Sequence, residues 1–396
     1  MKYLKKFQNH NAYDAFTNTD GFIKPNVSIC VQENEVHYNP YVYDYSQDYL
    51  TFVVKEDGTF QLSRNTVSYS LDNGETWTEL AANTASPTVA AGNKIMWKGT
   101  MTPSSSYGVG TFSATGNFDV QGNPMSILYG DNYKGQTDLT GKDYAFYQLF
   151  HQNTKVVSAE NLSLPATTLA QSCYNYMFNG CTSLTSAPEL PATTLAQSCY
   201  GGMFDGCTSL VNAPELPATT LVNYCYQNMF YGCTSLVNAP ELPATTLAKK
   251  CYAFMFQGCT ALTTAPTLPA TTLAEICYSS MFYGCTGLVT APELPATTLA
   301  IDCYTGMFRN CTSLTTAPEL PATTLANYCY QSMFYGCTNL NYIKAMFTTT
   351  PSTSYTRDWV NSVSASGTFV KNSAAQWNVS GVNGIPTGWT VQTASA

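Results

Sequence analysis

The chain has 396 residues, which predicts about two or three structural units rather than one. Charged residues make up only 11% of it, so its surface must consist largely of Thr, Ser, Asn, Gln and Tyr. The formal net charge of -8 argues against binding to nucleic acid or anionic lipid, and no segment is long and apolar enough for membrane insertion.

Residues 1–45 are the first predicted segment. The charged N-terminus is not followed by an apolar stretch, so a secretory signal peptide is not visible. The segments F-I-K-P-N-V-S (22–28) and E-N-E-V-H-Y-N (33–39) resemble the leading segment of virion proteins of Bacteroides phages, including crAss-like phages. This resemblance implies an attachment arm that docks on a phage capsid or tail protein after assembly in the cytoplasm.

Residues 46–130 are predicted to form a small antiparallel β-sandwich of the immunoglobulin-like kind. Strands are expected at 49–54, 66–71, 76–77 and 94–97, with D-G (57–58) and N-G (73–74) turns that indicate hairpins. The octapeptide S-L-D-N-G-E-T-W (70–77) resembles the Asp-box of sialidase propellers. It occurs once, whereas a propeller needs several blades, so we interpret it as a turn in which Asp72 binds nearby backbone amides.

Residues 131–347 contain seven near-identical 26-residue units, which suggests stacking. The consensus is C-Y-x-x-M-F-x-G-C-T-S-L-x-x-A-P-E-L-P-A-T-T-L-A-x-x. Cys173, Tyr174, Met177 and Phe178 have helix-compatible spacing, and Gly180 is suited to end a short helix. A short strand and a turn follow, interrupted by two prolines. Since one unit cannot bury its own apolar side, the sequence predicts an α+β solenoid of stacked repeats.

A degenerate unit beginning near Tyr144 is expected to cap the first full repeat. After Phe347 the sequence becomes aperiodic, and residues 348–396 contain three tryptophans suited to cover the other end as a C-terminal cap. The M-F-x-G-C-T-S-L and A-P-x-L-P-A-T-T-L signatures over about 144–347 resemble the BspA-like leucine-rich-repeat proteins of gut Bacteroidetes, of the treponemal type. The resemblance implies a leucine-rich-repeat solenoid, and a surface antigen or adhesin.

Fourteen of the fifteen cysteines are repeat positions. Their spacing within and between units is not that of a zinc site, and seven stacked thiols cannot pair completely within one column. We expect buried reduced thiols, with disulfides or a metal as alternatives. None of the three histidines lies inside the seven repeats, and no catalytic motif is present, so we expect no enzyme activity and no cofactor.

Two sets of repeat positions remain for function. An acidic column is expected to be a solvated edge, with a cation site as the alternative; it comprises Glu189, Glu215, Glu241, Glu293 and Glu319. Variable columns must face solvent, and exposed Tyr beside amides suits contact with a glycan or protein, although neutral variation explains the columns equally well. The candidate binding residues are Tyr224, Tyr231, Tyr283, Tyr328, Tyr335, Arg309, Lys249 and Lys250.

The sequence therefore predicts a non-enzymatic protein that displays a repeat surface for adhesion to a host glycan or protein. The leading hypothesis is a phage virion appendage or decoration protein at the virion surface, resembling a head or tail fibre. The alternative is a BspA-like adhesin on the bacterial cell surface. A homo-oligomer, such as a trimer, is expected because fibres and spikes are often trimers.

Overall fold

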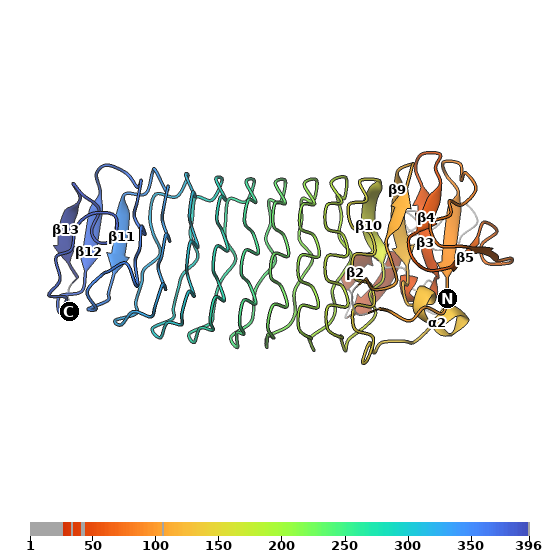
Figure 1. Ribbon diagram of the computed structural model, residues 1–396, viewed down its shortest axis with the longest axis horizontal. Coiled ribbons are helices and arrows are strands. Elements are labelled where there is room, and N and C mark those ends of the chain that lie inside the picture. Colours follow the sequence, from red (N-terminus) through yellow and green to blue (C-terminus); the bar gives the residue numbers. More distant parts are fainter. Residues whose placement is uncertain (1–26, 33–34, 41–43, 105–106, 395–396) are drawn as a thin grey trace.

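The computed structural model describes residues 27–32, 35–40, 44–104 and 107–394. Most of the predicted attachment arm, residues 1–45, therefore lies outside the described residues; within it, β1 (Val27–Gln32) and β2 (Glu35–Pro40) form an antiparallel pair. The rest of the molecule is elongated (Figure 1). A β-rich N-terminal part, a long row of stacked coils and a small C-terminal sheet follow one another along its axis.

The N-terminal part contains a six-stranded sheet with the order β10-β9-β3-β7-β5-β6. Its strands are β10 (Val156–Leu162), β9 (Phe118–Gly122), β3 (Leu50–Val54), β7 (Lys94–Lys98), β5 (Val67–Ser70) and β6 (Thr78–Leu80). All neighbours are antiparallel except β10, which pairs with β9 in parallel and extends the sheet beyond the predicted boundary at residue 130. A second antiparallel pair comprises β4 (Phe60–Leu62) and β8 (Phe112–Ala114).

The described residues of this part also form the short helices η2 (Tyr45–Gln47), α2 (Ser126–Tyr129) and η3 (Gly130–Asn132). The buried Phe52 ring of β3 joins the two sheets, since its centroid lies 5.4 Å from that of Phe60 and 5.0 Å from that of Phe112. It also lies 5.8 Å from the ring of Phe150 in the first coil. The predicted N-terminal β domain is therefore confirmed, and its core is continuous with that of the repeats.

The two predicted hairpin turns have different outcomes. The N-G turn joins β5 and β6, which pair as a hairpin. The Asp72 carboxylate accepts a hydrogen bond from the Thr76 amide at 2.9 Å, and Gly74 has a φ of 92°, so the Asp-box is the turn that its sequence predicts. The prediction of a hairpin at the D-G turn (57–58) is wrong, because the flanking strands β3 and β4 belong to different sheets. The Asp57 carboxylate instead accepts the Ala91 amide at 2.8 Å.

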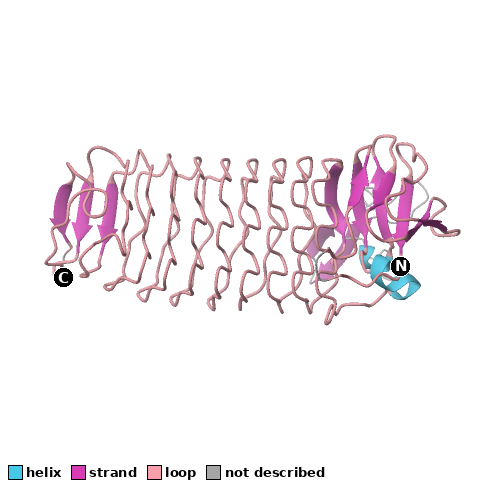
Figure 2. Ribbon diagram, in the orientation of Figure 1, coloured by secondary structure: helices cyan, strands magenta, loops and turns pink. Residues whose placement is uncertain are grey.

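The helix predicted in each repeat is also wrong. Between β10 and β11 (Tyr342–Ala345) the structure contains no α-helix (Figure 2). The run contains overlapping turns, in which alternate amides bond back three residues, as Met177 does to the Tyr174 carbonyl at 3.2 Å. The amides between them donate to the next coil, as Tyr174 does to the Cys199 carbonyl at 2.9 Å. We call this segment of each unit the turn run.

The turn run repeats every four residues rather than every 3.6. Ser172, Tyr176 and Gly180 have φ values of 54°, 55° and 73°, so every fourth residue adopts the left-handed conformation. That conformation is costly for residues other than glycine. The hydrogen bonds between coils offset the cost, and the same period buries the pairs 173–174 and 177–178. Gly180 thus has the positive φ expected of a helix end, but it belongs to a turn.

The extended half of each unit forms only isolated parallel bridges, such as Thr220 to Thr246 and Thr272 to Thr298. Continuous strands are prevented because the two prolines of each unit lack the amide hydrogen that a ladder requires. The predicted short strand is therefore not formed. The segment is nevertheless extended, and its single bridges to neighbouring units are parallel. What remains confirmed is a repeat protein with an N-terminal β domain.

Aromatic rings and thiols fill the interior of the stack. The rings of Phe230 and Phe256 lie 5.7 Å apart with an angle of 4° between their planes, and the equivalent rings of other units stack similarly. The fourteen repeat cysteines are free and buried. The Cys259 thiol donates to the Phe230 carbonyl at 3.1 Å, and burial raises the pKa of Cys251 to about 12. The repeat thiols therefore behave as small apolar residues, as the sequence predicts.

The C-terminal segment continues the stack although its sequence has lost the repeat. Strands β11, β12 (Thr368–Lys371) and β13 (Thr390–Thr393) form a parallel sheet. The three expected tryptophans lie between and beside these strands and are buried. The indole of Trp359 donates to the Gly384 carbonyl at 2.8 Å, and that of Trp377 to the Phe347 carbonyl at 3.1 Å. Aperiodic side chains thus cover the last regular coil while the backbone keeps the parallel pairing.

Candidate functional site

The turn runs present a common outward face. Alternating with the buried pairs, each run has three further pairs of positions that are partly exposed in most units; in the first unit these are 171–172, 175–176 and 179–180, whereas the pair 201–202 of the second unit is buried. Stacking aligns the pairs of all units, and we call the resulting rows columns 1, 2 and 3. The sequence-predicted residues fall into the outer two columns: Tyr224, Lys249, Lys250 and Tyr328 in column 1, and Tyr231, Tyr283, Arg309 and Tyr335 in column 3.

In column 3, a cation lies between two tyrosines. The Arg309 guanidinium carbon is 5.4 Å from the ring centroid of Tyr283 and 4.5 Å from that of Tyr335. Its Nε atom is buried and has no hydrogen-bond partner among the described residues. These contacts hold the guanidinium in place by cation–π attraction. The guanidinium also covers one face of each of the two tyrosine rings. A ligand can therefore contact less of these rings than expected from the sequence.

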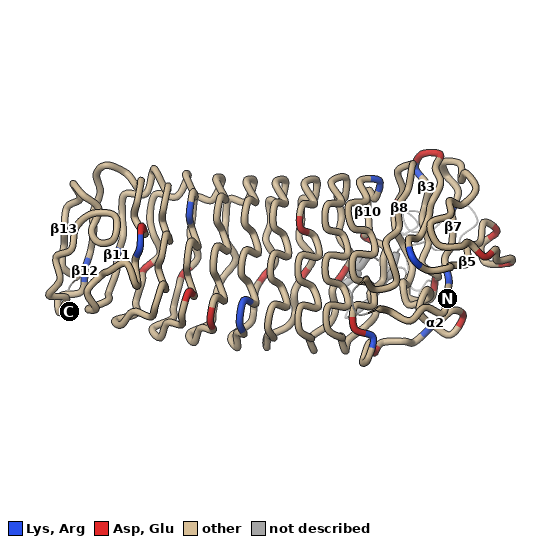
Figure 3. Tube along the Cα trace, viewed as in Figure 1, with Lys and Arg blue, Asp and Glu red and all other residues tan. Residues whose placement is uncertain are grey.

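The lysines of column 1 are engaged as well. Lys249 forms an ion pair of 2.8 Å with Glu275, and the Lys250 ammonium lies 5.7 Å from the ring centroid of Tyr224. Charged residues are sparse along the repeats (Figure 3). Tyr231 and Tyr328 are exposed, whereas the other six predicted residues are half-buried. The outward face is therefore a nearly neutral surface of amides, hydroxyls and phenol rings.

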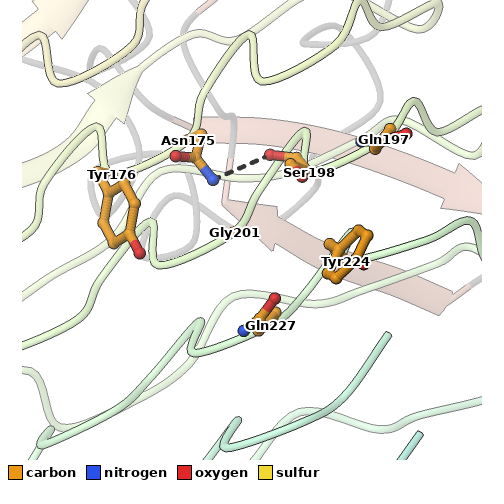
Figure 4. A pocket seen from close by; sticks show the side chains of 7 residues that line it. All are labelled: Asn175, Tyr176, Gln197, Ser198, Gly201, Tyr224 and Gln227. Atoms are coloured by element: carbon orange, nitrogen blue, oxygen red, sulfur yellow. Dashed lines mark hydrogen bonds between the residues drawn. The ribbon is translucent and has the colours of Figure 1, made fainter. Parts of the chain in front are cut away.

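Column 2 contains a hollow that the sequence analysis did not predict. Gly201 and Gly202 occupy positions where most other units have larger side chains, and a hollow of about 400 Å³ opens there (Figure 4). Its lining residues are Asn175, Tyr176, Gln197, Ser198, Gly201, Tyr224 and Gln227. The Tyr176 ring occupies the space that a side chain on Gly202 would need. The adjacent glycines were the signal available in the sequence, but only stacking shows that they open a hollow.

Asp205 in column 3 is expected to make the stability depend on pH. Burial raises the pKa of its carboxyl group to about 6, and no described cation pairs with it. A carboxyl whose pKa is higher in the folded than in the unfolded protein binds more protons when folded, so it lowers the stability as the pH rises from about 4 to about 6. Asp205→Asn should therefore stabilise the protein at pH 7 by about 1 kcal/mol, allowing for screening by solvent.

Urea unfolding of both proteins at pH 4 and pH 7 measures this difference. The gain should vanish at pH 4, where the wild-type carboxyl is protonated in the folded state. Asparagine suits the position, since Asn179 occupies it one unit earlier. Glu215→Gln, which removes an exposed carboxylate, is the control. An equal gain for Asp205→Asn at both pH values would contradict the assignment to ionisation.

The acidic column and His151 are the other candidate functional groups in the sequence, and the described residues do not gather them into a metal site. Glu319 of the acidic column pairs with Lys344 at 2.9 Å, and Glu241 accepts a hydrogen bond from Thr267. Burial lowers the pKa of His151 in the cap unit. Within residues 44–104 and 107–394, no three His, Cys, Asp or Glu residues are grouped to hold a metal ion. The described helices are all too short or too polar to cross a membrane.

Comparison with known proteins identifies the repeats. The model of the BspA type leucine rich repeat region, in six copies, matches residues 142–264 and 248–356, which together are more than half of the chain. Neither a curated protein nor a solved structure matches the chain. The first 45 residues lie outside the matched region, so the comparisons do not support their resemblance to phage virion proteins. The chain belongs to the family of proteins with BspA-type leucine-rich repeats.

Proposed function

We propose that this protein is a non-enzymatic adhesin of the bacterial cell surface, in which a leucine-rich-repeat solenoid presents its outward face to a glycan or protein of a host surface. The family supports this reading over the virion appendage that the first residues suggest, because surface adhesion is typical of proteins with these repeats. An attachment arm, a virion location and a trimeric assembly have no comparable support.

One observation carries the proposal: the variable positions lie together on the outward face, while the buried positions are nearly constant. Tyr174, Met177 and Phe178 recur in every full unit and are buried, whereas positions 171, 175 and 179 change from unit to unit. Since each coil is held by its neighbours, side chains on this face can vary without altering the core. A rigid support with a varied surface suits recognition of another molecule.

The proposal is tested by attachment of beads coated with the full chain to mucus-covered epithelial cells. Replacing Tyr231, Tyr283 and Tyr335 together with alanine should leave the circular dichroism spectrum unchanged and weaken attachment on the order of tenfold, because tyrosine is enriched among residues that dominate binding energy. The control replaces the exposed Val237 and Val289, which lie outside the three columns, with alanine. Absence of attachment by the wild-type chain would contradict the proposed function.

A further inference from the structure

We propose that the hollow at Gly201 is a binding site for a neutral pyranose ring of a glycan. This inference rests on the proposed function and specifies its ligand class. The hollow of about 400 Å³ falls within the range of roughly 300–1,000 Å³ that small-molecule sites occupy. It is open to solvent on the outward face, so a sugar that belongs to a longer chain can enter it.

Two tyrosines lie on opposite sides of Gly201 (Figure 4). Tyr176 is held beside Gly202 and makes an edge contact with Tyr147, with ring centroids 6.4 Å apart. The Lys250 ammonium, from the following coil, lies over one face of the Tyr224 ring. The other face is therefore turned towards the preceding coil, which carries Gly201. A phenol ring provides both an apolar surface for the C–H groups of a sugar and a hydroxyl for hydrogen bonding.

The remaining lining is polar and uncharged. Asn175, Gln197 and Gln227 contribute amides, which both donate and accept hydrogen bonds, as sugar hydroxyls do. The Asn175 side chain donates to the Ser198 carbonyl at 3.2 Å, which places the amide at the rim of the hollow. No Lys, Arg, Asp or Glu lines the hollow, so nothing in it compensates the charge of an ionised ligand. These groups favour a neutral saccharide.

A peptide fits the hollow less well. The backbone here is already bonded: the Gly201 amide donates to the Ser198 carbonyl at 3.2 Å, and the Gly202 amide to the Gln227 carbonyl at 2.8 Å. The Gly201 carbonyl accepts the Tyr176 amide at 2.9 Å. An added strand would therefore find no unpaired edge, and the polar lining offers no apolar pocket for an anchoring side chain. Saccharide recognition through side chains needs neither.

Gly201→Gln is the substitution that closes the hollow. Gly201 does not have a positive φ, and Gln227 and Gln331 occupy the same column in other units, so the fold accepts glutamine there. Its Cβ atom would lie 2.5 Å from Nδ2 of Asn175, the end of a side chain that can shift. Ser279→Gln adds the same side chain to column 2 three coils away, and serves as the matched control.

The probes are the methyl glycosides of glucose, galactose, mannose and N-acetylglucosamine, measured by saturation-transfer difference NMR on the full chain. At least one should bind saturably to the wild-type protein and to Ser279→Gln. Gly201→Gln and Tyr224→Ala should each weaken that binding on the order of tenfold. Saturable binding of none of the four glycosides, or equal binding to the wild-type and Gly201→Gln proteins, would overturn the inference.

Bead attachment of the same variants separates this inference from the proposed function. If the wild-type chain attaches to cells but binds no glycoside, adhesion stands and the sugar site is wrong. If the wild-type chain does not attach, the proposed function fails, whatever the glycosides do. If Gly201→Gln loses both glycoside binding and attachment while Ser279→Gln keeps both, the hollow is the sugar site through which the protein adheres.

Discussion

Replacing Phe256 with alanine is expected to lower the free energy of unfolding by about 3–5 kcal/mol. The Phe256 ring is fully buried in the middle of the stack, 5.7 Å from the rings of both Phe230 and Phe282. Neither neighbour can move into the space, because each is stacked on a further ring on its other side. The substitution therefore removes buried apolar area and leaves a cavity.

Equilibrium unfolding in urea, followed by circular dichroism, measures the loss. The control is Val289→Ala, since Val289 is 55% exposed and its truncation should change the free energy of unfolding by less than about 0.5 kcal/mol. Because each unit contacts only its neighbours, the substitution can also separate the transition into two steps. Similar unfolding midpoints for the Phe256 variant and the wild type would contradict the structure of the core.

Trp359→Ala is expected to have a similarly large effect, of about 3–5 kcal/mol, confined to the C-terminal end. Trp359 is fully buried, and its ring lies about 6 Å from those of Tyr330, Phe334 and Phe347. It closes the aromatic stack of the last regular coils. Its indole also donates to the Gly384 carbonyl, which ties the end of the chain to the coil before it.

Hydrogen exchange by mass spectrometry locates this effect. In Trp359→Ala, amides of 342–394 should exchange faster, while those of the middle units exchange as in the wild type. Trp359→Phe keeps most of the buried ring but loses the hydrogen bond, so it should cost about 1–2 kcal/mol. Uniform acceleration throughout the chain would show that the end segment does not act as a separate cover.

The sequence predicts the repeats and their interior well, because burial repeats with the units. Cys173, Tyr174, Met177 and Phe178 are buried as expected, and so are the tryptophans of the C-terminal segment. Of the N-terminal strands, β3, β5 and β7 are predicted, and β6 lies just after the predicted segment 76–77; β4, β8 and β9 are not predicted, and neither is β10. That strand pairs in parallel with a segment more than thirty residues earlier, and such pairing has no local signal.

The turn run could not be distinguished from a helix by its side chains. Over two turns, a period of four and a period of 3.6 bury the same positions, here 173–174 and 177–178. The difference lies in the positive φ of Ser172 and Tyr176, which no sequence rule assigns to such residues. The hollow was missed for a related reason: it depends on which side chains the neighbouring coils place beside Gly201.

The hydrogen bonds between turn runs all have the same direction, and this has an electrostatic consequence. In the peptide group that joins Cys173 to Tyr174, the carbonyl accepts from Phe146 in the preceding coil and the amide donates to Cys199 in the following coil. Its dipole therefore lies along the axis of the stack, and equivalent dipoles add from coil to coil as they do in an α-helix. The stack thus has a partial negative charge at its N-terminal end and a partial positive charge at its C-terminal end. Cations are therefore favoured near the N-terminal end of the stack, and anions near its C-terminal end.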